Sequence, residues 1–219
     1  MSTEASNTSS INTPPFKWRS MFLAYGTVMF LILLLGFFGN LFTVIVLRQR
    51  EHRKKCVTPL MINLAVTDLF IIVFGYPTIV SGNLKGDLLV AESPLCVWSG
   101  FVNGTTGIAS IATLTVLSGT VYQNIKRNCP NSQSNVSKRQ GIVLIVCSWL
   151  YGFIAMSPPL VGWNRFVPGR ASFSCAPDWV SPDVSSKVYI LLLIAMGFFV
   201  PLITISVFYY LTYRYVLKD

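Results

Sequence analysis

The 219-residue chain has few charged residues, because Asp, Glu, Lys and Arg together make up only 11% of it. Soluble domains carry about 25%, so this composition indicates a membrane protein. The chain has one His and five Cys, none of them in a CxxC pair or at the spacing of metal ligands, which argues against a zinc site. A glycine-rich phosphate loop, HExxH and GxSxG are also absent, so nothing predicts an enzyme.

The net charge is +9, because 17 Lys and Arg outnumber 8 Asp and Glu. Such an excess can indicate a nucleic-acid partner. Here, however, the basic residues flank apolar segments and form no stripe interleaved with aromatic side chains. We therefore expect membrane lipid and no nucleic acid as partner. The cluster at 48–55 has five positive charges and would also attract anionic lipid heads, at about 1 kcal/mol per charge.

Five apolar segments are each long enough to cross a bilayer, which requires about 20 residues. They lie at about 21–47, 58–80, 95–122, 140–160 and 187–213. Backbone groups inside a bilayer must pair internally, so all five should be helices. The sequence predicts an all-α transmembrane bundle over 21–219, preceded by a polar, disordered tail at 1–20.

The charges between the spans predict the orientation of the chain. The first and third loops are basic, whereas the loop at about 81–94 has one Lys against Asp87 and Glu92. By the positive-inside rule, the first and third loops are cytoplasmic and the amino terminus lies outside. Asn7, in the sequon Asn-Thr-Ser, is then a glycosylation candidate.

The span at 95–122 has no charge and is rich in Gly, Ser and Thr. Small residues let neighbouring helices approach closely, so we expect this span to be the central helix of the bundle.

Asp68 is the only acidic residue within a predicted span. A carboxylate at that depth costs at least about 2.5–3.5 kcal/mol and is a functional candidate. With Asn63 and Thr67 nearby, and with Asn40 and Ser110 on other spans, it could complete an oxygen-lined pocket for a small cation or a proton. The alternative is a structural hydrogen-bond cluster in which Asp68 is protonated.

The outer loop at 161–186 contains several turn residues and two Trp, which predicts an ordered lid rather than a linker. Cys175 in this loop and Cys96 at the outer end of the third span both face an oxidising compartment, so we expect a disulfide. In the fifth span, Pro201 should kink the helix. Phe198 and Phe199 precede it and could line a hydrophobic cavity, although such a pair is more often packing.

Together these motifs resemble the rhodopsin-like class of G-protein-coupled receptors. The matching residues, in chain order, are Gly39-Asn40, Asn63-Leu64-Ala65-x-x-Asp68, Cys96, Trp149, Pro201 and Tyr209. The lid is similar to the opsin second loop, in the runs Pro158-Pro159-Leu160-Val161-Gly162-Trp163, Pro168-Gly169 and Ser174-Cys175-x-x-Asp178-Trp179. The end of the second span, Gly75-Tyr76-Pro77, looks like non-visual opsins of the neuropsin type.

The resemblance implies the seven-helix receptor fold, retinal as cofactor, and a heterotrimeric G protein and a possible receptor oligomer as partners in the plasma membrane. The implied retinal pocket includes Asn103, Gly104, Gly107, Phe198 and Phe199. The implied sodium site joins Asp68 and Ser110, with Asn40 as a further candidate. The implied structural hub comprises Asn63, Trp149 and Pro201, with a hydrogen bond between the first two.

The sequence departs from the family pattern in three ways. The acid-Arg-Tyr signalling motif reads Thr120-Val121-Tyr122, so Val121 replaces the Arg that engages the G protein. Ser99 and Gly169 occupy positions where acidic residues occur in the family. The chain also encodes five spans, without the two that carry the retinal-bonding Lys.

The sequence therefore favours an opsin-like photoreceptor that is truncated and cannot bond retinal covalently. The alternatives are a non-photic receptor for a small ligand, or a truncated membrane partner that modulates a full-length receptor and is retained in the endoplasmic reticulum.

Overall fold

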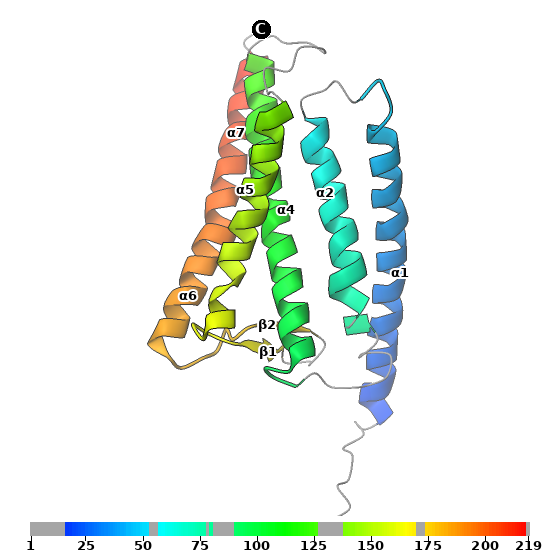
Figure 1. The fold of residues 1–219 in the computed structure, drawn as a ribbon, viewed down its shortest axis with the longest axis vertical. Coiled ribbons are helices and arrows are strands. Elements are labelled where there is room, and N and C mark those ends of the chain that lie inside the picture. The colour runs from blue at the N-terminus through cyan, green and yellow to red at the C-terminus, as the bar shows by residue number, and fades with distance from the viewer. Residues whose placement is uncertain are drawn as a thin grey trace, which may run out of the picture.

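The structure, a computed structural model, describes residues 16–52, 57–77, 79–80, 90–126, 138–169 and 174–217. In chain order the elements are α1 (Phe16–Leu47), α2 (Thr58–Phe70), π-helix η1 (Ile71–Gly75), α4 (Pro94–Lys126), α5 (Lys138–Met156), 3-10 helix η2 (Pro158–Val161), β1 (Phe166–Pro168), β2 (Cys175–Pro177), α6 (Val184–Ile194), π-helix η3 (Ala195–Phe199) and α7 (Val200–Val216). The helices run side by side, and the hairpin lies across the end where α4 begins (Figure 1).

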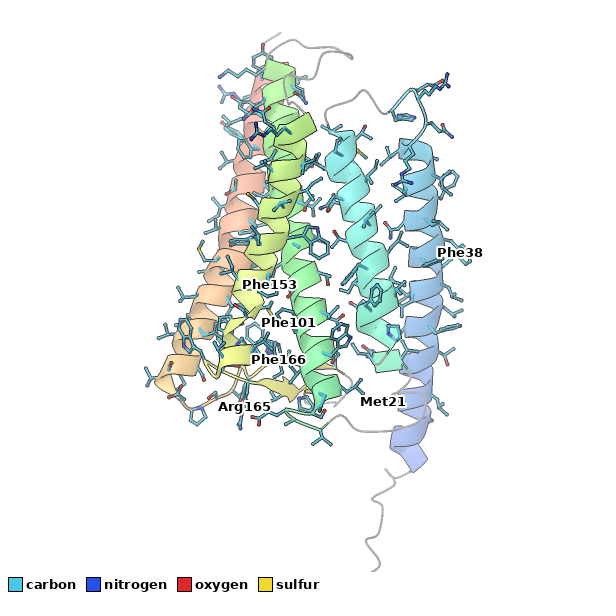
Figure 2. The ribbon with its side chains drawn as sticks, viewed as in Figure 1. Met21, Phe38, Phe101, Phe153, Arg165 and Phe166 are labelled. Carbon is cyan, nitrogen blue, oxygen red and sulfur yellow. A yellow bond between two sulfur atoms is a disulfide. The ribbon has the colours of Figure 1, made fainter. Side chains whose placement is uncertain are left out.

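Five helices are long and apolar enough to cross a membrane. The fifth is formed by α6, η3 and α7 together, which run from Val184 to Val216. The predicted transmembrane helical bundle is thus confirmed, with one small hairpin added. Large apolar side chains cover the outer surface, as expected for helices that face lipid. Phe38 of α1, for example, is 63% exposed and points away from the bundle (Figure 2).

Helix α4 lies at the centre and packs against α2, α5, α7 and both strands. Close approach depends on glycine at two contacts. A side-chain carbon at Gly152 of α5 would lie 2.5 Å from the carbonyl oxygen of Thr105. One at Gly119 of α4 would lie 3.1 Å from the ring of Phe208. The small residues thus do what the sequence predicts, which is to let neighbours surround this helix.

The helices differ from the predicted spans at their ends. The first begins at Phe16, inside the segment predicted as a tail, and the third continues to Lys126. Hydropathy marks the apolar part of a helix, whereas its hydrogen bonds continue into polar residues. The fifth span starts early because Asp183 caps it, since its Oδ2 accepts a hydrogen bond from Ser186 N at 2.8 Å.

The α-helical part of the fourth span ends at Met156 instead of 160. Pro158 and Pro159 have no N–H to continue the α-helical ladder, and the chain enters the 3-10 helix η2.

Both π-helices end two residues before a proline. η1 precedes Pro77 and η3 precedes Pro201. In each, a backbone N–H reaches back five residues, from Tyr76 to Ile71 O and from Val200 to Ala195 O. The sequence predicts a kink at Pro201, and the local distortion that the structure shows there is a π turn. A proline crowds the carbonyl four residues before it, and a wider turn relieves that contact.

Candidate ligand-binding site

The lid is fixed to α4 by a disulfide. Strand β2 pairs antiparallel with β1, and Cys175 of β2 is bonded to Cys96 near the start of α4, as the sequence predicts. Phe166 of β1 is 1% exposed and packs with both cysteines and Met156. A side-chain carbon at Gly100 would lie 2.6 Å from the ring of Phe166, so this glycine lets the lid lie directly on α4.

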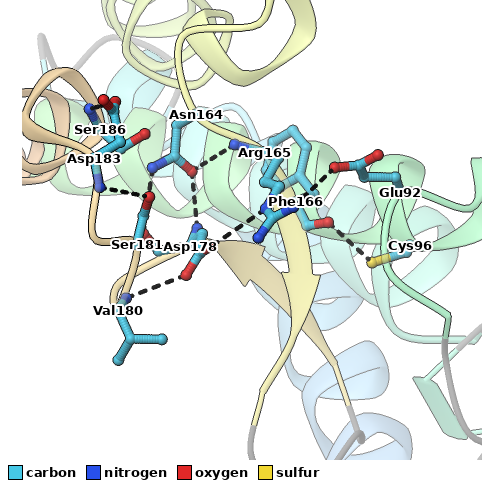
Figure 3. A network of polar contacts seen from close by, with 10 residues as sticks. All are labelled: Glu92, Cys96, Asn164, Arg165, Phe166, Asp178, Val180, Ser181, Asp183 and Ser186. Carbon is cyan, nitrogen blue, oxygen red and sulfur yellow. Dashed lines mark hydrogen bonds and ion pairs between the residues drawn. The ribbon is translucent and has the colours of Figure 1, made fainter.

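A buried asparagine organises the end of the lid (Figure 3). Asn164 Oδ1 accepts hydrogen bonds from the backbone N–H of Arg165 at 2.7 Å and of Asp178 at 2.8 Å. Its Nδ2 donates to Asp178 O at 3.2 Å. Asn164 has a φ of 112°, a backbone conformation that Asn tolerates better than most residues. The sequence analysis missed Asn164, because its role depends on Asp178, which lies 14 residues away and directly after β2.

An ionic group lies beside this asparagine. Arg165 Nε donates to the buried Asp178 Oδ2 at 3.2 Å, and its NH1 lies 3.7 Å from Glu92. Arg165 and Glu92 are 59% and 60% exposed, so their ion pair contributes little to stability. The buried carboxylate of Asp178 also accepts a hydrogen bond from the N–H of Val180 at 3.2 Å. The hydrogen bonds of Asp178, rather than the exposed ion pair, therefore order the loop.

A cavity of about 490 Å³ lies under the lid, a size that suits a small molecule. Its lining comes from α4, α5, β2 and the fifth span. The lining residues are Gly100, Asn103, Gly104, Ile108, Met156, Cys175, Ala176, Pro177, Trp179, Leu193, Ile194, Gly197 and Phe198. None of these described residues is charged. The cavity therefore suits a neutral, largely apolar ligand.

Three of the five predicted pocket residues, Asn103, Gly104 and Phe198, line this cavity. Gly107 and Phe199 do not belong to the lining. Phe199 follows Phe198 directly, so it points in another direction around the helix. Its ring meets that of Phe198 edge to face, with centroids 5.2 Å apart. Phe198 therefore both lines the cavity and packs against Phe199.

The sequence analysis missed several lining residues, among them Met156, Trp179 and Leu193. Met156 lies so close to Gly104 that any side chain there would overlap its thioether. Trp179 was visible as part of the lid motif, but its place on the cavity depends on how the lid folds back. No sequence pattern distinguishes Leu193 as a lining residue, because the fifth span contains several Leu in similar surroundings.

Among the described residues, Asn103 provides the only side-chain amide on the cavity. Its Oδ1 is buried and has no hydrogen-bond partner among the described residues. This oxygen lies against Gly75, the last residue of η1, where a side chain would overlap it. A buried acceptor without a donor costs about 1–3 kcal/mol, so a donor from a ligand or a water would stabilise this site.

Asn63 joins three helices below the cavity. Its Nδ2 donates to Thr113 Oγ1 of α4 at 3.0 Å, and its Oδ1 accepts from Trp149 Nε1 of α5 at 3.1 Å. The second bond is the one that the resemblance implies. Pro201, the third predicted hub residue, lies buried at the start of α7.

The structure does not join the predicted sodium-site residues. Asn40 Nδ2 donates to Gly36 O of its own helix at 2.9 Å. Within the described ranges no hydrogen bond or ion pair links Asn40, Asp68 and Ser110, and no group of three His, Cys, Asp or Glu gathers there. The sodium site stays a prediction.

The carboxyl end of α4 carries the altered signalling motif. Thr120 is buried and donates to Val116 O at 2.8 Å, and Val121 is half-buried. The ring of Tyr122 lies 6.0 Å from that of Phe208 of α7. The contact between these two rings packs α4 against α7. The predicted glycosylation site, Asn7, lies outside the described residues.

The chain is similar in sequence to known proteins. The profile of the family described as "7 transmembrane receptor (rhodopsin family)" matches residues 39–219. A protein named "Rhodopsin, GQ-coupled" from Mizuhopecten yessoensis is 31% identical over 199 residues, covering 90% of this chain and 39% of that protein. Rhodopsin of Alligator mississippiensis is 26% identical over 209 residues, covering 91% and 58%.

The crystal structure of squid rhodopsin has the same fold, with a TM-score of 0.82 at 22% identity over 91% of this chain and 54% of that chain. The chain thus spans between 39% and 58% of the length of these relatives. The family consists of receptors, which confirms the prediction of a protein that is not an enzyme. A match of this extent, together with five membrane-spanning helices, shows that the chain is a multi-pass membrane protein of the rhodopsin family of seven-transmembrane receptors.

Proposed function

We propose that the chain is an opsin-like receptor whose cavity binds retinal for light sensing. The uncharged cavity under the disulfide-bonded lid is the observation that carries this proposal. Retinal is an elongated, apolar polyene with one polar end, and the lining offers aliphatic walls, two aromatic side chains and a single amide. The similarity of the chain to proteins named rhodopsin supports retinal over other apolar ligands.

The lining supports a non-covalent mode of retinal binding. A covalent imine requires the amine of a lysine, and none of the described lining residues is a lysine. These residues would therefore bind retinal by burying its apolar surface, which contributes about 25 cal/mol per Å². Trp179 and Phe198 would contact the polyene from the lid and from the fifth span, while Asn103 would meet a polar group.

Binding can be measured on the purified chain in lipid nanodiscs, by energy transfer from tryptophan to added retinol. We expect saturable transfer that 11-cis-retinal abolishes by competition. Gly197→Leu should remove it, because Gly197 lines the cavity and a side chain would fill that space. Gly39→Leu is the matched control, since the Cβ of the same side chain would have no atom of a neighbouring segment within 4 Å there.

Absence of saturable transfer, or equal transfer in both variants, would contradict a retinoid site in this cavity. A borohydride-sensitive visible band after addition of 11-cis-retinal would contradict non-covalent binding, because it would reveal an imine.

We further propose that the amino terminus lies outside, with Asn7 glycosylated, and that the receptor acts at the plasma membrane on a heterotrimeric G protein. Val121 should weaken that coupling, because it has no cationic group where the family has Arg. Nucleotide exchange on a Gq-type protein should rise in Val121→Arg. An unchanged rate would exclude this residue as the cause of weak coupling.

A further inference from the structure

The carbonyl of Met196 lacks a backbone donor. In an α-helix it would accept from the N–H of residue 200, but that N–H bonds to Ala195 O in the π turn. In the π register it would accept from residue 201, which is a proline and has no N–H. The combination of η3 and Pro201 thus leaves one carbonyl unpaired within a membrane span, where an unpaired backbone group costs several kcal/mol.

Tyr151 supplies the missing donor. Its hydroxyl, on α5, donates to Met196 O at 2.7 Å. The bond crosses between helices and therefore also sets the position of the π turn relative to α5. The two residues that follow Met196 are Gly197 and Phe198, and both line the cavity.

A second tyrosine makes the reciprocal bond. Tyr189 of the fifth span donates its hydroxyl to Ala155 O of α5 at 3.0 Å. The α-helical donor to that carbonyl would be residue 159, which is again a proline. Each helix of this pair thus offers a tyrosine to a carbonyl that a proline in the other helix leaves unpaired.

We propose that Tyr151 is a positioning residue of the cavity: it replaces the hydrogen bond that Pro201 removes and so holds Gly197 and Phe198 in the cavity wall. The part that concerns the ligand rests on the proposed retinal function, whereas the part that concerns the backbone does not. Tyr151 itself is not among the lining residues, so it acts through Met196.

The proposal predicts a specific coupling between two substitutions. Tyr151→Phe removes only the hydroxyl, so amide hydrogen exchange in peptides across 196–202 should accelerate and retinol affinity should fall about threefold to tenfold. Pro201→Ala restores an N–H that can pair with Met196 O. In that background Tyr151→Phe should change both readouts by less than twofold.

Tyr189→Phe is the matched control. It also removes one hydroxyl between the same two helices, but the carbonyl that it serves does not depend on Pro201. Its effects should therefore be the same with and without Pro201→Ala. This separates a general loss of packing between α5 and the fifth span from the specific replacement of a proline's missing donor.

Equal effects of Tyr151→Phe in both backgrounds, or no change in exchange across 196–202, would overturn the proposal. If Tyr151→Phe alone prevents folding, adding Pro201→Ala should restore the helical circular dichroism, and failure to do so would also overturn it. Should the unaltered chain bind no retinoid, the retinal function fails, but the hydrogen-exchange comparison still decides the role of Tyr151.

Discussion

Replacement of Gly152 by alanine should force α5 away from α4. The added carbon would lie 2.5 Å from Thr105 O and 3.1 Å from Ala109 N, both backbone atoms that cannot rotate aside. Ordinary contacts begin near 3.4 Å, so the first distance is short by about 0.9 Å. The helices would have to separate by most of that amount along this seam.

Overpacking of this kind costs about 1–3 kcal/mol. In a chain of this length, each kcal/mol lowers the unfolding temperature by about 2–4 °C. We therefore expect Gly152→Ala to unfold roughly 2–12 °C lower, as measured by circular dichroism of the chain in detergent. Gly141→Ala, on the same helix, is the matched control, because its nearest neighbour, Pro59 Cβ, would lie at an ordinary 3.9 Å.

Alanine normally stabilises a helix relative to glycine, so the control should unfold at the same temperature as the unaltered chain or slightly higher. If Gly152→Ala matches the control, the close α4–α5 seam does not exist and the reasoning from it is refuted.

Three further predictions follow from contacts between helices and the lid. Cys175→Ser opens a disulfide between residues 79 apart, which should cost about 4 kcal/mol and raise the rate of retinol release; equal release rates would show that the lid closes without it. Asn63→Ala leaves Trp149 Nε1 without its acceptor, so unfolding should become easier by about 1–3 kcal/mol and the tryptophan emission should shift; unchanged values would exclude the hub. Asn164→Ala removes three hydrogen bonds to the lid backbone, and proteolysis between residues 164 and 180 should accelerate, whereas Val180→Ala should leave it unchanged.

Much of the fold could be predicted from the sequence, because length and hydropathy are local properties of a chain in a bilayer. They placed all five spans, and the Gly, Ser and Thr content of 95–122 placed α4 at the centre. The chemical identity of single residues also predicted two specific contacts, the disulfide and the bond between Asn63 and Trp149. Only two cysteines face the outer side in the predicted topology, and the bond between Asn63 and Trp149 followed from the resemblance.

The tertiary structure alone decided which side chains reach the cavity. Phe198 lines it and Phe199 does not, because consecutive residues of a helix point in directions about 100° apart, and hydropathy carries no information about that rotation. Pro201 predicted a distortion, but only the tertiary structure shows that Tyr151, 45 positions away, donates a hydrogen bond to Met196 O in the π turn before it. Asn164 likewise acquires its role only when β2 folds back against β1. Spans are determined by the solvent around them, whereas the site is determined by the distances and directions between them, which no local pattern encodes.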